Sequence, residues 1–484
     1  MKEQRVRLNR YKILSEDDLS RIHQASLKLL SETGMAIHSK KVVELLKEAG
    51  AKVDLERKRV RIPKDLIEIT LDCLPSEIVL YDRNKNPALT LGDNESHLAS
   101  GHNAIYVLDS NTLTRRAATK KDVARFARLA DALENIHVVS AQAMPQDVVP
   151  KASLLHAVEA VFNNTEKHLY FSPESCEVTR AIIGMARAVV GDGSFSETPI
   201  LTCQLSSTSP LSWEGGAADA VVEAARAGVP LVFLPQPYAG VTAPITLAGV
   251  LTVHNAELLS GIVISQLVRK GTPVVYGSAW TTFDMRQANV VIGGPETALM
   301  RIAGAQLARF YHIPSHTIGP DSDSHCLDEQ NAWEKFLTLH SAFTSGVNLV
   351  VNAGMIATGL TVSFEQLVLD NEMAGIVYRL VEGIEISPQT IALEVIKRVG
   401  PKGNFLEEPH TLKYLRSSEH WQPKLSNRSV YEKWIEDGGK DVVEKAREIS
   451  KKILTHHQPK NLTEKVRSRL REIIREFEEK SLPG

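Results

Sequence analysis

Short apolar runs alternate with segments of helical spacing along most of the chain from about residue 137 onward. Each run is followed by a polar loop, and the loop by a segment in which apolar residues recur with the period of an amphipathic helix. The runs are residues 137–143, 168–171, 199–205, 230–234, 273–276, 313–318 and 348–351. The spacing between them fits one strand, one loop and one helix, and repeated units of that kind predict a parallel β-sheet.

About eight such units close into a (β/α)8 barrel of the TIM type. The sequence shows seven clear runs, so one strand is expected to be irregular or hidden. A doubly wound sheet is the alternative, but no glycine-rich nucleotide loop follows the first run. We therefore predict an α/β fold with the barrel over residues 136–400. Residues 1–135 are expected to form a mixed α/β region packed on the barrel, and residues 401–484 a loop-rich segment followed by C-terminal helices.

Helix starts and a charged helical region mark the two ends of the chain. Ser15 and Asp18 have the spacing of a capping box, which predicts a helix from there, and Thr119 begins a second one. Lysines and glutamates alternate over residues 430–480, which predicts a helix or helix pair with a solvated outer face. Subunit contact is the less favoured use of that face.

Composition narrows the class of protein. The 484 residues include 56 Lys and Arg against 58 Asp and Glu, a formal net charge of −2, so there is no basic field for nucleic acid. The polar start shows no signal peptide, and no apolar run looks long enough to span a membrane. The 4 cysteines are far apart and form no CxxC pair, which fits reduced thiols. We expect a cytoplasmic protein with neither nucleic-acid nor membrane partners.

Residues 320–330 concentrate titratable side chains where an apolar run ends and a helical pattern begins near Asn331. In a (β/α)8 barrel this turn lies on the carboxyl rim, where such folds place their chemistry. A solvated acidic turn is the alternative. The potential metal ligands in and beside the stretch are His316, Asp321, Asp323, His325, Cys326 and Asp328. Their spacing matches no compact zinc signature, and neighbouring residues of an extended turn point apart, so we expect no metal.

Other residues on the predicted rim suggest substrate binding. Tyr238, Tyr276, Trp280 and Phe283 lie in or beside two rim loops and could form an aromatic box around a cation. For each one alone the better explanation is structural, with Tyr276 in the core and the other three capping the barrel. Arg286 follows in the second loop. Glu257 lies within a helix beside a histidine and an asparagine, where it either faces solvent or joins a buried polar network. His410 lies in the late loop-rich segment and is a candidate to fold over the rim. Hydrolysis by a serine nucleophile has little support, because no GxSxG motif is present.

The order of motifs resembles the trimethylamine methyltransferase family, and the resemblance runs along almost the whole chain. The matching stretches are Thr242 to Gly249, Asn255-Ala256-Glu257, Pro273 to Ser278, Asp284-Met285-Arg286, Gly294-Pro295-Glu296, Ser322-Asp323, Asp328, Gln330 and Trp421 to Leu425. The resemblance implies a (β/α)8 barrel that moves a methyl group from an amine to the cobalt of a separate corrinoid protein. The chain matches only the start of a cobalamin-binding DxHxxG turn, with Asp328 in the glycine's place, so it is expected to bind no corrinoid itself.

Members that use pyrrolysine place it where this sequence has His325, so the chain resembles the non-pyrrolysine members, such as glycine betaine methyltransferases. The expected substrate is then a quaternary amine, held by aromatic faces. We expect His325 to orient it, with Asp323 or Asp328 fixing the imidazole tautomer. Arg286, His325 or His410 would meet a betaine carboxylate, and Gln330 and Glu257 are further candidate contacts.

The expected partners are a cognate corrinoid protein, the small quaternary amine and further copies of the chain. Two other classes stay open at this point. A metal-dependent barrel hydrolase would hold stoichiometric metal. A non-catalytic betaine-binding protein would bind the ligand and never methylate a corrinoid.

Overall fold

The computed structural model describes residues 10–54, 56–92, 95–110, 112–191 and 195–481. Eight parallel strands close into a barrel in the order β10-β11-β13-β14-β17-β18-β6-β9. They are β6 (His97–Ser100), β9 (Val138–Ser140), β10 (His168–Phe171), β11 (Leu201–Leu205), β13 (Leu231–Phe233), β14 (Val274–Ser278), β17 (Ser315–Ile318) and β18 (Leu349–Ala353). The predicted TIM-type barrel is confirmed, and seven of its strands coincide with or overlap the apolar runs of the sequence.

The eighth strand is β6, which lies within residues 1–135, the segment that the sequence assigns to the N-terminal region. It pairs with β18 on one side and β9 on the other and so closes the ring. All four of its residues are buried, but it begins with His97 and ends with Ser100, so it carries no apolar run to reveal it.

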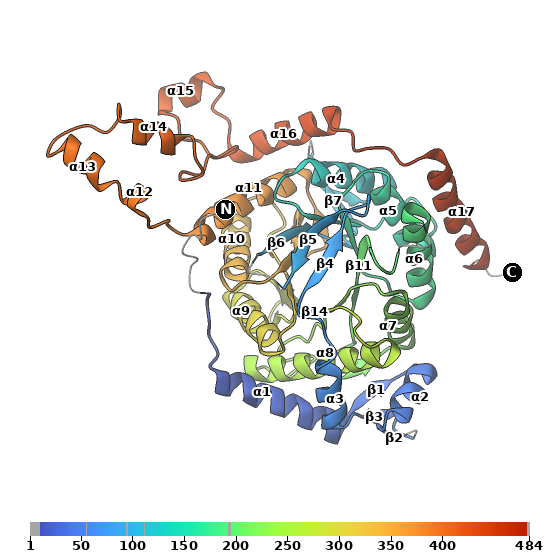
Figure 1. Ribbon diagram of the computed structural model, residues 1–484. Helices are drawn as coiled ribbons and strands as arrows, with labels where there is room; N and C mark the ends of the chain where they lie inside the picture. The colour runs from blue at the N-terminus through green and yellow to red at the C-terminus, as the bar shows by residue number, and fades with distance from the viewer. Residues whose placement is uncertain (1–9, 55, 93–94, 111, 192–194, 482–484) are drawn as a thin grey trace.

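One helix follows each barrel strand and covers the outside of the ring (Figure 1). They are α4 (Lys120–Ala132), α5 (Ser153–Phe162), α6 (Cys176–Val190), α7 (Gly215–Ala227), α8 (Leu247–Val268), α9 (Pro295–Phe310), α10 (Glu329–Thr344) and α11 (Phe364–Glu382). Side-chain caps start several of them: Thr119 and Asp122 form a capping box on α4, and Ser363 accepts from the backbone N–H of Gln366 on α11.

The helix α8 is 22 residues long and apolar enough to cross a membrane by length and composition, which the sequence pattern did not reveal. In the protein it is a core helix, and 72% of its most apolar window is buried. The helices α1 (Glu16–Lys28), α3 (Lys64–Leu71) and α7 pack against it. Its apolar character is therefore explained by burial on several sides.

A hairpin of β4 (Ile78–Tyr81) and β5 (Pro87–Leu91) covers the amino-terminal end of the barrel; in Figure 1 it lies across the ring. Ile78, Leu80 and Leu91 join one apolar cluster with inward-facing strand residues such as Val138 and Val232. The imidazole Nδ1 of His168, at the start of β10, lies 2.8 Å from the carbonyl oxygen of Tyr81. The hairpin therefore fills this end of the barrel.

Smaller sheets flank the ring. The N-terminal region adds α2 (Lys40–Glu48), β1 (Met35–Ile37), β2 (Lys52–Asp54) and β3 (Arg59–Arg61), with β12 (Ser212–Trp213) in the same sheet. A second sheet contains β7 (Tyr106–Leu108), β8 (Arg115–Ala117), β19 (Met355–Ile356) and β20 (Thr361–Val362). β15 (Thr282–Asp284) pairs with β16 (Asn289–Val291). Ser15 and Asp18 form the predicted capping box at the start of α1.

The C-terminal part has two regions. An arm, residues 384–436, projects from the flank of the barrel in Figure 1 and carries α12 (Pro388–Ile391), α13 (Leu393–Val399), α14 (Pro409–Leu415) and α15 (Tyr431–Glu436). The helix pair α16 (Val442–His456) and α17 (Glu464–Ser481) then returns to the barrel, where α16 packs on α11 and α17 on α6. The predicted C-terminal helix pair is thus present, with its inner face against the barrel helices.

Candidate active site

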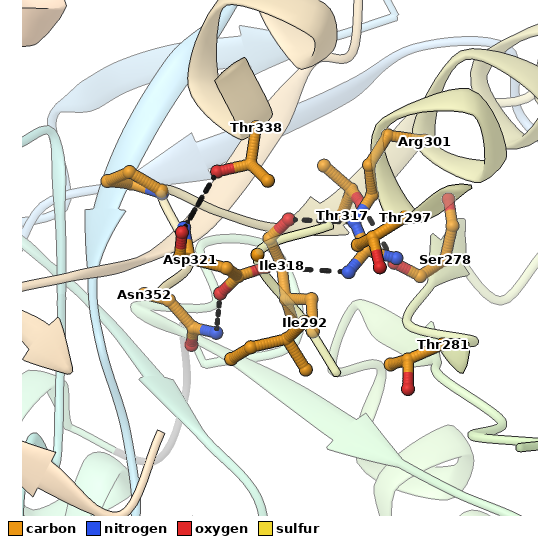
Figure 2. Close-up of polar contacts among 12 residues, drawn as sticks. Ser278, Thr281, Ile292, Thr297, Arg301, Thr317, Ile318, Asp321, Thr338 and Asn352 are labelled. Carbon is orange, nitrogen blue, oxygen red and sulfur yellow. Dashed lines mark hydrogen bonds and ion pairs between the residues drawn. The ribbon is translucent and has the colours of Figure 1, made fainter. Parts of the chain in front are cut away.

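A buried ion pair anchors the 320–330 stretch to the carboxyl end of the barrel (Figure 2). Arg301 of α9 reaches Asp321, with 3.4 Å between Nη2 and Oδ2, and both side chains are buried. The guanidinium also donates to the carbonyl oxygens of Ile318 and Trp280, at 3.2 and 3.0 Å, and Asn352 donates to Asp321 Oδ1 at 2.8 Å. Burial raises the pKa of Asp321, and Arg301 opposes that rise. The pair therefore holds the start of the rim loop in place.

The two aspartates expected to fix the tautomer of His325 bond elsewhere. Asp323 accepts from the backbone N–H groups of Ile292 and Gly293, each at 3.0 Å, which ties the stretch to the loop after β16. Asp328 is the N-cap of α10 and accepts from Asn331 N at 2.9 Å, which lowers its pKa. The His325 side chain is exposed on the rim.

Tyr276 and Trp280 lie behind the barrel wall and do not face its interior. Side chains alternate along a strand, and Val275 belongs to the interior cluster, so Tyr276 points outward. Its hydroxyl donates to Asn255 Oδ1 on α8 at 2.9 Å. The Trp280 ring contacts His254 at 3.8 Å between centroids and lies beside Gly304 of α9. A box of these four aromatic residues is therefore not formed. Tyr276 is part of the core, as the structural alternative predicts, and Trp280 is buried in the core as well.

The other expected binding residues are spread over the rim and beyond it. Tyr238 and Phe283 are half-buried in the loops after β13 and β14, and Arg286 is exposed in the β15–β16 turn. Gln330 donates to Glu334 Oε1 at 2.9 Å within α10. His410 lies in the arm on α14, where its Nε2 is 3.0 Å from the carbonyl oxygen of Gln389. The structure thus does not bring His410 to the rim.

Glu257 fastens the loop after β11 from behind. It is fully buried on α8, and its carboxylate accepts from the hydroxyls of Ser207 and Ser209 at 3.0 and 2.7 Å and from Leu211 N at 2.7 Å. Burial raises its pKa, and these three bonds oppose the rise. Of the two sequence-based explanations, the buried polar network is the one the structure contains, with Glu257 as a positioning residue.

A second polar group lies inside the barrel, and of its residues the sequence pattern indicated only His316, as a potential metal ligand. The Tyr170 hydroxyl donates to Gln204 Oε1, and it lies 3.1 Å from His316 Nε2. Because a hydroxyl has one proton to give, His316 Nε2 must donate to it, so the Nδ1 atom of His316 keeps its lone pair. Burial holds the pKa of His316 well below its usual value, and it is therefore neutral.

Further buried polar atoms without a partner lie on the segments after β6 and β9 and on β17. His102 lies edge-on to Tyr170, with 5.4 Å between ring centroids, and burial lowers its pKa to about 4. Buried polar atoms without a hydrogen-bond partner among the described residues include His102 Nδ1, Asn103 Oδ1, Gln142 Oε1 and His316 Nδ1. The amide nitrogens of Asn103 and Gln142 donate to backbone carbonyls, which leaves their oxygens free. Buried acceptors need a donor or a cation, so these atoms are candidate ligand contacts.

Within the described residues, no three His, Cys, Asp or Glu side chains gather closely enough to hold a metal ion. In the 320–330 stretch the Cys326 thiol donates to Asp328 Oδ2 at 3.3 Å, and hydrogen bonding to that carboxylate raises the pKa of Cys326.

Comparison with known proteins identifies the family to which the chain belongs. The model of the family described as trimethylamine methyltransferase matches residues 1–481. A trimethylamine methyltransferase of Desulfitobacterium hafniense is 37% identical over 466 residues, which cover 96% of this chain and 94% of that one. A glycine betaine methyltransferase from another strain of that species is 33% identical over 472 residues, 96% of this chain and 97% of the relative. The chain belongs to the trimethylamine methyltransferase family.

A solved structure agrees with the fold of this family member. The monomethylamine methyltransferase of Methanosarcina barkeri has a TM-score of 0.53 to it at 14% sequence identity, over 98% of this chain and 90% of that one. At this level of identity the likeness concerns the fold alone.

The interior residues of this trimethylamine methyltransferase family member had a signal that motif searches pass over. Inward and outward positions alternate along a strand, so the inward Tyr170 predicts that residues two positions apart on neighbouring strands meet inside the ring. Gln204 occupies such a position on β11, the neighbour of β10, whereas His316 reaches Tyr170 from β17 on the opposite side of the ring. Arg301 gave no comparable signal, because it lies within a helix and meets Asp321 only through the closed fold.

Proposed function

We propose that this chain transfers a methyl group from a betaine-type quaternary amine to the Co(I) of a separate corrinoid protein. Family membership and the glycine betaine methyltransferase relative support a methylated amine as substrate. The observation that carries the choice of a quaternary amine is the set of buried, unpartnered acceptors Asn103 Oδ1, Gln142 Oε1 and His316 Nδ1, together with the neutral imidazoles of His102 and His316. A trimethylammonium group presents only weakly positive C–H edges, which such acceptors and an aromatic ring accommodate.

The proposed methyl transfer needs no acid–base catalysis by the protein. The cobalt lone pair attacks a methyl carbon in line, and the C–N bond breaks with its electron pair on nitrogen. The nitrogen starts with a positive charge and leaves as a neutral tertiary amine, so no general acid is required. The protein's tasks are then to position the methyl group, to exclude water and to leave room for the acceptor.

Residues on the rim have a different task in this proposal. The exposed His325 occupies the position at which the pyrrolysine-using members of the family have pyrrolysine. In this proposal it contacts the substrate from the rim side, and Arg286 is a further contact for the substrate carboxylate. Tyr238 and Phe283 provide half-buried aromatic surface nearby. Asp321, Asp323 and Asp328 act as positioning residues, since their carboxylates hold the loop that presents His325.

The corrinoid belongs to a partner in this proposal, and the chain itself binds no cofactor. That partner docks at the carboxyl end of the barrel, the end that carries the rim loops. We expect the reaction to take place in the cytoplasm. The barrel supplies the chemistry, and the N-terminal region and the C-terminal segment support it from outside.

The reaction is tested by mixing the purified protein with photoreduced cobalamin and, in turn, glycine betaine, carnitine, γ-butyrobetaine and proline betaine. A change from the Co(I) to the methyl-Co(III) absorbance with one of them is the expected result and identifies the substrate. His325→Ala should then slow the transfer. Binding of a betaine without methylation of either free cobalamin or a corrinoid protein would instead mean a non-catalytic binding protein.

The interior site is tested by calorimetric titration of the same betaines into His316→Phe. This variant keeps an aromatic ring of similar shape and removes the free lone pair, so betaine affinity should fall at least about tenfold, the loss of one buried polar contact. His254→Phe is the matched control, because His254 is equally buried but lies on α8, outside the barrel wall. Equal loss in both variants would contradict the interior site.

A further inference from the structure

The helices of the arm lack an apolar core of their own. Its four helices, α12 to α15, have 4, 7, 7 and 6 residues, and none has a buried residue. Isolated helices of that length do not persist in water, so they need packing from elsewhere. Large apolar side chains are exposed along the arm instead: Ile384, Ile386, Ile391, Leu393, Ile396, Phe405, Leu406, Leu412, Leu415, Val430, Tyr431 and Ile435.

The exposed area is large enough for a stable interface. Leu406 is 76% exposed, and Ile384 and Ile386 are each 67% exposed. Summed along the arm, these side chains expose on the order of 1,000 Å² of apolar surface. A standard protein–protein interface buries about 800 Å² on each partner.

A second unpartnered surface, the α10 patch, lies on the same flank of the barrel. It consists of Tyr11, Trp333, Phe336, Leu337 and His340. The four α10 residues follow the spacing of one helix face. Trp333 is 63% exposed, Phe336 stacks on His340, and Tyr11 meets the His340 ring edge-on. Burial lowers the pKa of His340, so the patch is uncharged at neutral pH. An aromatic surface without charge is typical of an interface core.

The arm is anchored so that it projects beside this patch and away from the rim. Arg379, near the end of α11, donates through Nε and Nη2 to the carbonyl oxygen of Glu419, at 3.0 and 2.9 Å. The hydroxyl of Tyr378, the residue before Arg379, donates to the carbonyl oxygen of Ser96, just before β6 starts. The arm therefore starts at the amino-terminal end of the barrel, and α10, the neighbour of α11, lies on that flank (Figure 1).

We propose that the arm of one copy of this chain packs on the α10 patch of a second copy, and that the exchange is reciprocal. Each copy contains both surfaces, so a two-fold axis buries all four at once in an isologous dimer. The anchor at the amino-terminal end keeps the arm away from the carboxyl rim, so the proposed partner with the corrinoid still has access there. This inference stands whether or not the proposed methyl transfer is correct.

The association is tested by sedimentation velocity of the full chain over a range of micromolar concentrations. We expect a dimer, or an assembly built from dimers. Leu406→Glu in the arm and Trp333→Glu in the patch should each weaken self-association by at least about thirtyfold, the effect of losing one strong interface contact. Ile69→Glu is the matched control: Ile69 is 62% exposed on α3, outside both surfaces, and the change should leave association as it is.

Cross-linking tests which surfaces meet. Two preparations, one with Leu406→Cys and one with Trp333→Cys, both also carrying Cys326→Ser, are mixed and treated with a short thiol cross-linker. A cross-linked species of twice the chain mass that contains both variants supports the exchange. A chain that stays monomeric, an oligomer insensitive to both glutamate variants, or a Leu406→Cys, Trp333→Cys double variant that cross-links only within one chain would overturn the proposal. Circular dichroism of each variant confirms that the barrel is folded.

Discussion

The barrel and the arm use the same kind of residue in opposite ways. Around the barrel, apolar side chains are buried on both faces of each strand, and polar groups such as Asp321 and Glu257 are buried with partners. In the arm, every isoleucine and leucine except Leu425 lies in solvent. The difference lies in the length of the helices. Each barrel strand is followed by a helix long enough to cover it, whereas no arm helix exceeds 7 residues. An apolar residue is therefore evidence of a core only where an element can close over it.

The largest expected effect is on the buried ion pair. Asp321→Ala leaves the guanidinium of Arg301 buried without its countercharge and should cost about 3–5 kcal/mol of the free energy of unfolding. Urea denaturation followed by circular dichroism measures this. Asp284→Ala, at a half-buried position of the rim hairpin, is the control and should cost far less. A cost below about 1 kcal/mol for Asp321→Ala would mean that the pair does not anchor the rim.

A leucine pair tests the comparison directly. Leu367→Ala in the barrel helix α11 removes a fully buried side chain and should cost about 2–5 kcal/mol. Leu406→Ala in the arm should change the free energy of unfolding of the dilute, dissociated protein by less than about 0.5 kcal/mol. Similar values for the two variants would show that the arm is packed in solution as firmly as the barrel.

The pH dependence of stability should reflect the buried histidines of the barrel. Burial lowers the pKa of His168 to about 4, against about 6.5 in the unfolded chain. Between these values the unfolded state binds the proton and the folded state does not, so stability falls as pH decreases from about 6.5 to about 4. His168→Gln should flatten that part of the curve, by on the order of 1–3 kcal/mol at pH 4. Parallel curves for variant and wild type would contradict this assignment.

The smallest expected effect is on the fastening of the loop after β11. Glu257→Gln keeps one acceptor oxygen and loses the charge, so we expect a cost of about 1–2 kcal/mol. Limited proteolysis should then cut within residues 206–211 more quickly than in the wild type. Glu394→Gln in the arm, where the carboxylate is exposed, is the control. An unchanged cleavage rate in Glu257→Gln would show that the loop is held by other contacts.

The fold was predictable from sequence because each barrel strand but one is an apolar run with a helix after it. The strand β6 was not predicted because its four buried residues, His97 to Ser100, contain too few apolar side chains to form a run. The position of the 320–330 stretch on the rim was predictable from topology. The contacts of its residues were not, because the partners of Asp321 and Asp323 come from α9 and from the loop after β16, and no local spacing encodes them.

The aromatic residues show a further limit. Tyr276 and Trp280 were grouped with Tyr238 and Phe283 because all four lie near rim loops along the chain. Inward and outward positions alternate with every residue, so closeness to a loop does not determine which side of the wall a ring occupies. Tyr170, which does face the interior, is in the middle of an apolar run and therefore looked like core.

The hairpin β4–β5 determines the order of binding and release in the proposed reaction. Since it fills the amino-terminal end of the barrel, the amine and the corrinoid protein must use the same face. The amine then enters before the larger partner docks, and the demethylated product leaves after the partner departs. A compulsory-order kinetic pattern, with the demethylated amine competing against the methylated one, is the signature of such a one-sided site.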